Sequence, residues 1–220
     1  MNNLIFDLDG TIINSSKEVM ICFEKAFKAS NYSIDKSRLT PNIIGPPLKD
    51  IVKLIAPELE NEQILDTIVQ NFHNVYDNDY EDISFIFDGM LELLSDAKKQ
   101  GKRLFIATYK PTKPTERIIS MFRLNMFEDV YTIDKFGKHI TKTQMIEHII
   151  QKYNLNKSDT VMIGDAPSDV KSAKEANITA VGVLWGYGDN KKPLIENSDI
   201  ILNSIDNLRE YLKIKNENLV

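Results

Sequence analysis

The sequence predicts an α/β protein built on a parallel sheet with helices on both faces, with a small helical bundle inserted near the start of the chain. Three observations predict this class. After about residue 84, short apolar runs alternate with amphipathic segments, which is typical of a parallel sheet and its helices. Residues 3–8 form a nearly continuous apolar run, as expected of a strand buried on both faces. Between about residues 14 and 83 the periodicity is helical only.

The predicted core domain comprises residues 1–13 and 84–220. Apolar runs place its strands at residues 3–8, 102–107, 129–133, 160–163, 178–183 and 199–202. Helical periodicity places its helices at residues 89–100, 114–123, 142–153, 168–176 and 205–213. Gly101 follows the first of these helices, at the position where glycine commonly ends a helix.

The inserted segment, residues 14–83, is predicted to be a cap domain made of a small helical bundle. Its first helix is expected to begin near Ser15, because Ser15 and Glu18 have the spacing of a capping box. Two more helices are expected at about residues 48–55 and 64–76. Short linkers at residues 11–14 and 83–87 would form a hinge between the two domains.

The composition is that of a globular protein of one to two domains. In 220 residues, 27 Lys+Arg stand against 32 Asp+Glu, which gives a net charge of −5. An acidic balance without a basic run argues against nucleic acid as a partner. The chain lacks an apolar run of the ~20 residues that a membrane span needs, so we expect a soluble, cytoplasmic protein. The single cysteine, Cys22, is expected to be a small buried hydrophobe.

Polar side chains follow several of the predicted strands at the point where each strand ends. In an open parallel sheet the ligand lies beyond the carboxyl ends of the strands, so these side chains are the functional candidates. They are the four carboxylates Asp7, Asp9, Asp165 and Asp169, together with Thr108 and with Lys142 at the start of a helix. Carboxylates held together repel one another unless a cation joins them, and oxygen ligands favour Mg²⁺. The sequence therefore predicts a magnesium and phosphate site.

Each of these signals also has a simpler interpretation. Asp-Gly-Thr alone is a common turn, but the whole string Asp7-Leu8-Asp9-Gly10-Thr11 is expected by chance in only about two chains in a thousand of this length. Asp169 could act simply as a helix cap. Lys142 lies in the first turn of a helix, next to a capping box formed by Thr141 and Gln144. A cation is disfavoured there by the helix dipole, so we expect an anionic partner for it.

Together these motifs resemble those of the haloacid dehalogenase superfamily, and the resemblance covers essentially the whole chain. The four family motifs correspond to residues 7–11, Thr108, Lys142 and residues 164–169. The resemblance implies a Rossmann-like sheet with a mobile cap, and the inserted helices resemble the cap of the phosphoglycolate phosphatase and β-phosphoglucomutase branch.

The resemblance also implies a role for each site residue. Asp7 would attack phosphorus to form an aspartyl-phosphate, and Asp9 would be the general acid and base. Mg²⁺ would be held by Asp7, by the Asp9 backbone carbonyl and by Asp165. The phosphate would be bound by Thr108, Tyr109 and Lys142, and Asp169 would orient metal-bound water or hold Lys142. Tyr109 departs from the family pattern, in which a small polar residue usually stands, so its phenol could narrow the pocket or contact the leaving group.

An aspartate at position 9 resembles the phosphatases and mutases of the superfamily. We therefore expect a Mg²⁺-dependent phosphatase acting on a small phosphorylated molecule. Two alternatives remain at this point: a sugar-phosphate mutase, and a phosphate-binding regulatory protein without turnover. In the cap, Lys49 could contact an anionic leaving group, or it could be an ordinary solvated lysine at a helix start. The physiological substrate and the oligomeric state stay open.

Overall fold

The computed structural model describes residues 1–78, 83–188 and 191–216. It divides into two compact units. The core unit comprises Met1–Asn14, Ile86–Gly186 and Asn190–Val220, and the cap unit comprises Ser15–Phe85 and Tyr187–Asp189. Residues 79–82 of the predicted cap, and residues 189–190 and 217–220 of the predicted core, lie outside the described residues. Each unit is described below by itself.

The core unit contains a six-stranded parallel sheet, which confirms the predicted fold class. Its strands run in the order β5-β4-β1-β6-β7-β8. Their bounds are Asn3–Phe6 (β1), Arg103–Thr108 (β4), Asp129–Thr132 (β5), Thr160–Gly164 (β6), Thr179–Val183 (β7) and Ile200–Leu202 (β8). β1 pairs with β4 on one side and with β6 on the other, so the chain order reverses beside β1. Such a switch point is where open α/β sheets bind their ligands.

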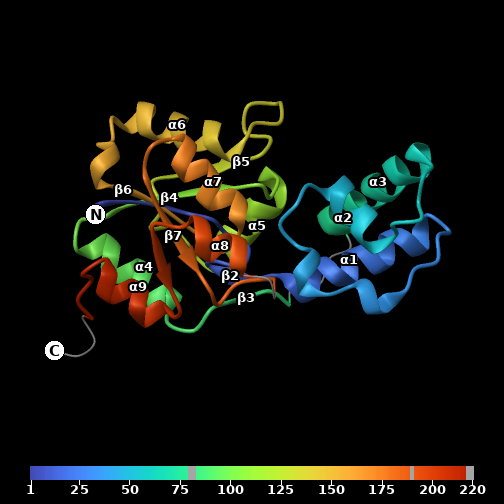
Figure 1. The fold of residues 1–220 in the computed structure, drawn as a ribbon, viewed down its shortest axis with the longest axis horizontal. Helices are drawn as coiled ribbons and strands as arrows, with labels where there is room; N and C mark the ends of the chain where they lie inside the picture. The colour runs from blue at the N-terminus through green and yellow to red at the C-terminus, as the bar shows by residue number, and fades with distance from the viewer. Residues whose placement is uncertain (79–82, 189–190, 217–220) are drawn as a thin grey trace. The chain divides into compact units, whose positions relative to one another are not determined.

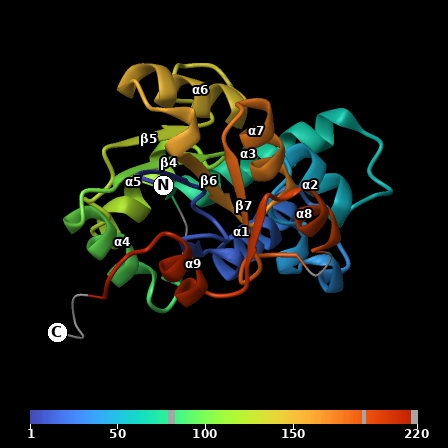
Figure 2. The same ribbon diagram turned by 60° about the vertical axis from the view of Figure 1, so that its left-hand side comes forward.

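Helices cover both faces of this sheet, as the sequence predicts (Figures 1 and 2). Side chains alternate along a strand, so Leu4 and Phe6 pack on one face while Ile5 packs on the other. The first face is covered by α4 (Met90–Lys99), α5 (Thr112–Met121) and α9 (Ile205–Tyr211). The second is covered by α6 (Lys142–Tyr153), α7 (Pro167–Glu175) and α8 (Lys192–Asn197).

Most helices of the core differ from their predicted bounds by one or two residues, and one helix was not predicted. α5 begins at Thr112, two residues before the predicted start, because Pro114 falls in the first turn, where a backbone N–H has no partner within the helix. The six-residue α8 lies at Lys192–Asn197, where no helix is predicted. A helix this short shows less than two turns of periodicity, and its position follows from Leu194, which packs into the core.

Among its described residues, the cap unit contains three α-helices around an apolar core of its own. They are α1 (Ser16–Ala29), α2 (Leu48–Ile55) and α3 (Glu62–Asn78). Phe23 of α1 lies with its ring centroid 4.3 Å from that of Phe72 in α3. Cys22 is buried in this core, as predicted. Two short strands, β2 (Ile13–Asn14) and β3 (Phe85–Ile86), pair where the chain passes between the units.

The capping box predicted at the start of α1 is not formed. The Ser15 side chain makes no cap hydrogen bond, and its hydroxyl lies 3.1 Å from the hydroxyl of Tyr187. The backbone N–H of Ser15 donates to the same Tyr187 oxygen at 2.6 Å. Glu18 instead accepts a hydrogen bond from Ser84. The prediction is wrong because both side chains bond to residues that are distant in the sequence, Ser15 to Tyr187 and Glu18 to Ser84.

Within residues 1–78, 83–188 and 191–216, every helix is too short or too polar to traverse a bilayer.

Candidate active site

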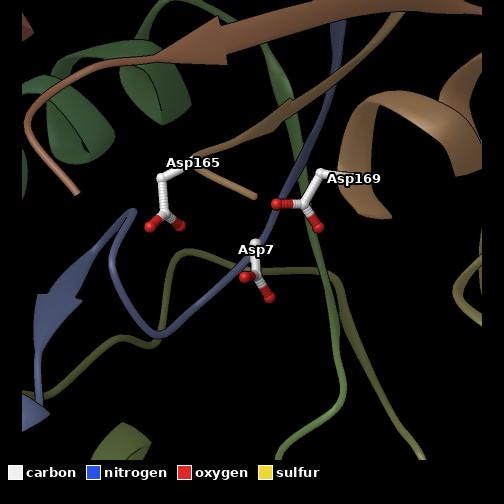
Figure 3. Close-up of side chains that lie close together, drawn as sticks. All are labelled: Asp7, Asp165 and Asp169. Atoms are coloured by element: carbon white, nitrogen blue, oxygen red, sulfur yellow. The ribbon is translucent and has the colours of Figure 1, made fainter. Parts of the chain in front are cut away.

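Three carboxylates converge at the carboxyl edge of the sheet (Figure 3). Asp7 follows β1, Asp165 follows β6, and Asp169 lies in the first turn of α7. One oxygen from each of the three lies within 4.8 Å of the others, and all three residues are buried. Carboxylates this close and this well buried call for positive charge among them.

The sheet register brings these residues together. Phe6 of β1 is level with Ile163 of β6, and the backbone N–H of Asp7 continues the pairing by donating to the Ile163 carbonyl at 2.9 Å. The next residue, Gly164, leaves room for Asp169, because a Cβ at Gly164 would lie 2.2 Å from an Asp169 oxygen. Only glycine allows the two segments to approach so closely.

Asp165 is enclosed by the loop that follows Asp7. Thr11 donates a hydrogen bond from its hydroxyl to Asp165 Oδ1 at 3.0 Å. Gly10 has a φ of +81°, and a Cβ there would lie 2.3 Å from Asp165 Oδ2. On the other side, a Cβ at Gly186 would meet the Asp165 side chain at 2.3 Å, and Trp185 donates from Nε1 to the Thr11 carbonyl at 3.0 Å. Asp165 therefore has a single well-defined position.

Lys142 supplies a buried positive charge to two of these carboxylates, Asp7 and Asp169. Its Nζ lies 3.0 Å from Asp7 Oδ1 and 2.5 Å from Asp169 Oδ1, and its side chain is 2% exposed. The predicted capping box of Thr141 and Gln144 is present at the start of α6. Lys142 thus has the anionic partners that its place in the first helical turn requires.

Asp169 bonds to two partners, Lys142 and the backbone of Ala166. Its Oδ1 pairs with Lys142, and its Oδ2 accepts the backbone N–H of Ala166 at 3.0 Å. It therefore caps the start of α7 and positions the lysine with one carboxylate.

Burial dominates the electrostatics of the site. It raises the pKa of Asp7 to about 8 against the opposing effect of the Lys142 ammonium, and the carboxylates of Asp169 and Asp165 raise it further. Burial alone would lower the pKa of Lys142, but Asp169 and Asp7 outweigh it and raise that pKa above its usual value. Lys142 therefore stays protonated at neutral pH, and its ammonium is the nearby charge that opposes the effect of burial on the pKa of Asp7.

The last residue of β4 and the residues that follow it lie at the same edge of the sheet. Thr108 is buried, and its hydroxyl accepts the backbone N–H of Lys110 at 3.1 Å. Tyr109 contacts Lys142 twice. Its hydroxyl accepts the backbone N–H of Lys142 at 3.3 Å, and the ammonium of Lys142 lies 4.9 Å from the centroid of its ring.

Lys110 is a site residue that the sequence reasoning did not identify. Its Nζ lies 3.0 Å from Asp9 Oδ1 and 3.3 Å from Oδ2, and its side chain is only 3% exposed. The available signal was its place two residues after Thr108, on a strand whose end was already a candidate. A lysine is usually solvated, so the residue type alone did not single it out.

Lys49 is the candidate site residue that the sequence places in the cap. It belongs to the cap unit, where its half-exposed side chain pairs with Asp66 at 2.5 Å. Its predicted contact with a leaving group stays a prediction.

The donor set suits a hard divalent cation. Asp7, Asp165 and Asp169 offer carboxylate oxygens within reach of one another, and oxygen ligands of this kind favour Mg²⁺. Asp7 is buried, and Lys142 is at ion-pair distance from its Oδ1. A carboxylate has about four lone-pair sites, so Asp7 can also bind a cation.

The chain is similar in sequence to proteins that are named as a kinase and as a pyrophosphatase. Tyrosine-protein kinase PtkA of Mycobacterium tuberculosis is 28% identical over 220 residues, which cover 96% of this chain and 72% of PtkA. Pyrophosphatase PpaX of Halalkalibacterium halodurans is 26% identical over 218 residues, which cover 98% of each protein.

The fold is shared with solved structures along nearly its whole length. The crystal structure of a predicted phosphatase from Clostridium acetobutylicum matches with a TM-score of 0.84 and 27% identity, over 96% of this chain and 98% of that one. Residues 4–183 match the sequence model of the haloacid dehalogenase-like hydrolases. With its fold, its motifs and most of its length in agreement, the chain belongs to the haloacid dehalogenase-like hydrolase family.

Proposed function

We propose that this protein is a Mg²⁺-dependent phosphatase that hydrolyses a small phosphate monoester through an aspartyl-phosphate on Asp7. The observation that carries this proposal is the cluster of Asp7, Asp165 and Asp169 at the carboxyl edge of the sheet, with Lys142 paired to Asp7 and Asp169. Family membership and the phosphatase names of similar proteins support it.

Asp7, Asp165 and the backbone carbonyl of Asp9 would hold the Mg²⁺. When bound, the ion would neutralise charge on the carboxylates and on the phosphoryl oxygens. The steric fit around Asp165, where neither Gly10 nor Gly186 leaves space for a side chain, supports a site that needs this carboxylate in one place.

In the first step an Asp7 carboxylate oxygen attacks phosphorus, and the bond from phosphorus to the leaving oxygen breaks. Asp9 gives its proton to that oxygen, so the leaving group departs as a neutral hydroxyl. Asp7 and Asp9 both follow β1 closely, at the edge of the sheet where the substrate would bind.

In the second step a water molecule attacks the phosphorus of the aspartyl-phosphate. Asp9, now ionised, takes a proton from that water, and the bond from phosphorus to the Asp7 oxygen breaks. The products are inorganic phosphate and an Asp7 carboxylate, so the enzyme returns to its starting state.

Positive charge and hydrogen-bond donors meet the negative phosphoryl oxygens during both steps. The Lys142 ammonium is held by Asp7 and Asp169, and it would stabilise the transferring group. The Thr108 hydroxyl and the backbone N–H of Tyr109 would donate to the same group. The cap unit would close over the site to exclude water and select the leaving group, with Lys49 as a candidate contact.

The direct test is the release of inorganic phosphate from p-nitrophenyl phosphate with Mg²⁺, and then with EDTA. We expect turnover only with the metal, and loss of it in Asp7→Asn, which keeps the shape of the side chain but lacks the nucleophile. Asp88→Asn is the matched control, because Asp88 is exposed. Turnover that survives EDTA, or full activity of Asp7→Asn, would falsify the proposal. Counting inorganic phosphate also separates hydrolysis from phosphoryl transfer to another acceptor.

A further inference from the structure

We propose that Lys110 is a specificity-determining residue that favours phosphate esters whose leaving group carries a negative charge of its own, such as a carboxylate or a second phosphate close to the scissile bond. This inference rests on the proposed phosphatase function, because it assigns Asp9 to the leaving oxygen. It concerns residues of the core unit only.

The position of the Lys110 ammonium is well defined. Both oxygens of Asp9 lie within hydrogen-bond distance of it, at 3.0 and 3.3 Å. The backbone of Lys110 is held as well, because its N–H donates to the Thr108 hydroxyl at 3.1 Å. At 3% exposure the lysine side chain is almost completely removed from water, whereas Asp9 keeps 19% of its side chain exposed. The carboxylate therefore faces the open part of the site, and the ammonium lies behind it.

This geometry places the ammonium close to the leaving group of a bound substrate. To protonate the leaving oxygen, Asp9 must lie one hydrogen bond away from it, at about 2.7 Å. Since Lys110 Nζ lies 3.0 Å from Asp9, it lies within about 6 Å of the leaving oxygen. The oxygens of a carboxylate on the next carbon lie about 3 Å beyond the leaving oxygen, so they fall within about 9 Å of the ammonium.

The charges decide which leaving groups benefit. As Asp9 gives up its proton, the carboxylate that forms would repel an anionic leaving group at this distance, in a site that is shielded from bulk water. The Lys110 ammonium offsets that repulsion. A neutral alcohol gains nothing from the same charge. A buried ion pair is also weak evidence for a purely stabilising role, because desolvation consumes most of its attraction.

The test compares two substrates that differ by one charge: phosphoglycolate and its primary amide, phosphoglycolamide. For wild type with Mg²⁺ we expect kcat/KM to favour the carboxylate by at least about tenfold, the order expected for one charged contact. Lys110→Met should reduce this ratio about tenfold, and Lys110→Arg, which keeps the charge, should preserve most of it. Using the ratio removes any common effect that the variant has on Asp9.

Lys171→Met is the matched control, because that lysine is 76% exposed on α7, and it should leave the ratio unchanged. A wild-type enzyme that treats both substrates equally, or a Lys110→Met variant with the wild-type ratio, overturns the assignment. In either case hydrolysis of p-nitrophenyl phosphate, and with it the proposed function, would stand. If wild type with Mg²⁺ hydrolyses none of the three substrates, the proposed function fails and this assignment fails with it. The wild-type ratio of kcat/KM for the two substrates still tests the preference for an anionic leaving group if a Lys110 variant does not fold.

Discussion

Tyr109 and Lys142 contact each other at two points, the hydroxyl with the backbone and the ring with the ammonium. The Tyr109 hydroxyl accepts the N–H of the residue that begins α6, at 3.3 Å, and its ring centroid lies 4.9 Å from Lys142 Nζ. One side chain therefore holds both ends of the lysine. The lysine side chain is long and flexible, and the Tyr109 ring beside it limits the rotamers that it can adopt. Tyr109, which departs from the family pattern at this position, thus has Lys142 as a partner within the protein.

We predict that Tyr109 acts on activity through Lys142. Tyr109→Phe removes one hydrogen bond and keeps the ring, so kcat should fall by about threefold, which corresponds to roughly 0.7 kcal/mol. Tyr109→Ala removes the ring as well, and kcat should fall by about tenfold or more with little change in KM. Steady-state kinetics with p-nitrophenyl phosphate measure both variants.

The control for this prediction is a double-mutant cycle with Lys142→Met. Binding of inorganic phosphate, measured by calorimetry with Mg²⁺ present, is the second readout. Tyr109→Ala should weaken phosphate binding in the wild-type background and have no further effect once Lys142 is absent. Additive effects of the two substitutions would show that Tyr109 acts elsewhere.

The raised pKa of Asp7 predicts a pH-dependent stability effect in metal-free protein. The folded pKa is about 8 against an ordinary value of 3.8, so between these values the folded protein retains a proton that the unfolded chain has lost. Stability therefore falls as the pH rises through this window and levels off above about 8. Asp7→Asn removes the cost, on the order of 1–3 kcal/mol for a buried polar group. In EDTA, its Tm advantage over wild type should grow from pH 5 to pH 8 and then stay constant. An advantage that is independent of pH would contradict the assignment of this cost to Asp7.

Gly10 is predicted to be necessary for the position of Asp165. Gly10 and Gly101 have nearly the same φ, +81° and +79°, but an added Cβ meets Asp165 Oδ2 at 2.3 Å only at Gly10. Both Gly10→Ala and Gly101→Ala should lose about 1 kcal/mol from backbone strain. Gly10→Ala alone should also weaken Mg²⁺ affinity and lower kcat, because Asp165 must move. Calorimetric titration with Mg²⁺ compares the two variants, and equal affinities would refute the steric explanation.

Mg²⁺ is predicted to stabilise the folded protein through Asp165. A ligand at 100 times its Kd stabilises by about 2.7 kcal/mol, and this should raise Tm by several degrees in a chain of this length. Asp165→Asn can still accept the hydrogen bond from Thr11, so it should fold, but its Tm should respond far less to Mg²⁺. Asp88→Asn should respond as wild type does. Differential scanning fluorimetry across a Mg²⁺ series measures the three proteins, and an undiminished response of Asp165→Asn would remove this residue from the metal site.

Periodicity and strand ends were sufficient to predict the sheet and the gathering of Asp7, Asp165 and Asp169. The strands of the core are short runs of buried apolar residues, and parallel strands bring their carboxyl ends to one edge. The capping box at Thr141 and Gln144 was predictable for the same reason, since both partners lie within one helical turn. The strands, their ends and the capping box all depend on residues that are close together in the sequence.

Contacts between distant residues were not predictable in this way. The Ser15 and Glu18 side chains have the spacing of a capping box, but Tyr187 and Ser84 take them up. Helix α8 is ordered by the burial of Leu194 rather than by a helical pattern of its own. In each case the favourable partner lies far away in the chain, so local propensity is outweighed.

The sequence by itself determined the class of fold, the order of its elements and which residues reach the edge of the sheet, because hydrophobic period and chain punctuation act locally. Only the tertiary structure decided how the charges pair: Lys142 with Asp7 and Asp169, and Lys110 with Asp9. These partners are separated by up to 135 residues for Lys142 and Asp7. The fold alone brings them within 3 Å. Because an unpaired buried charge is costly, burial favours these ion pairs.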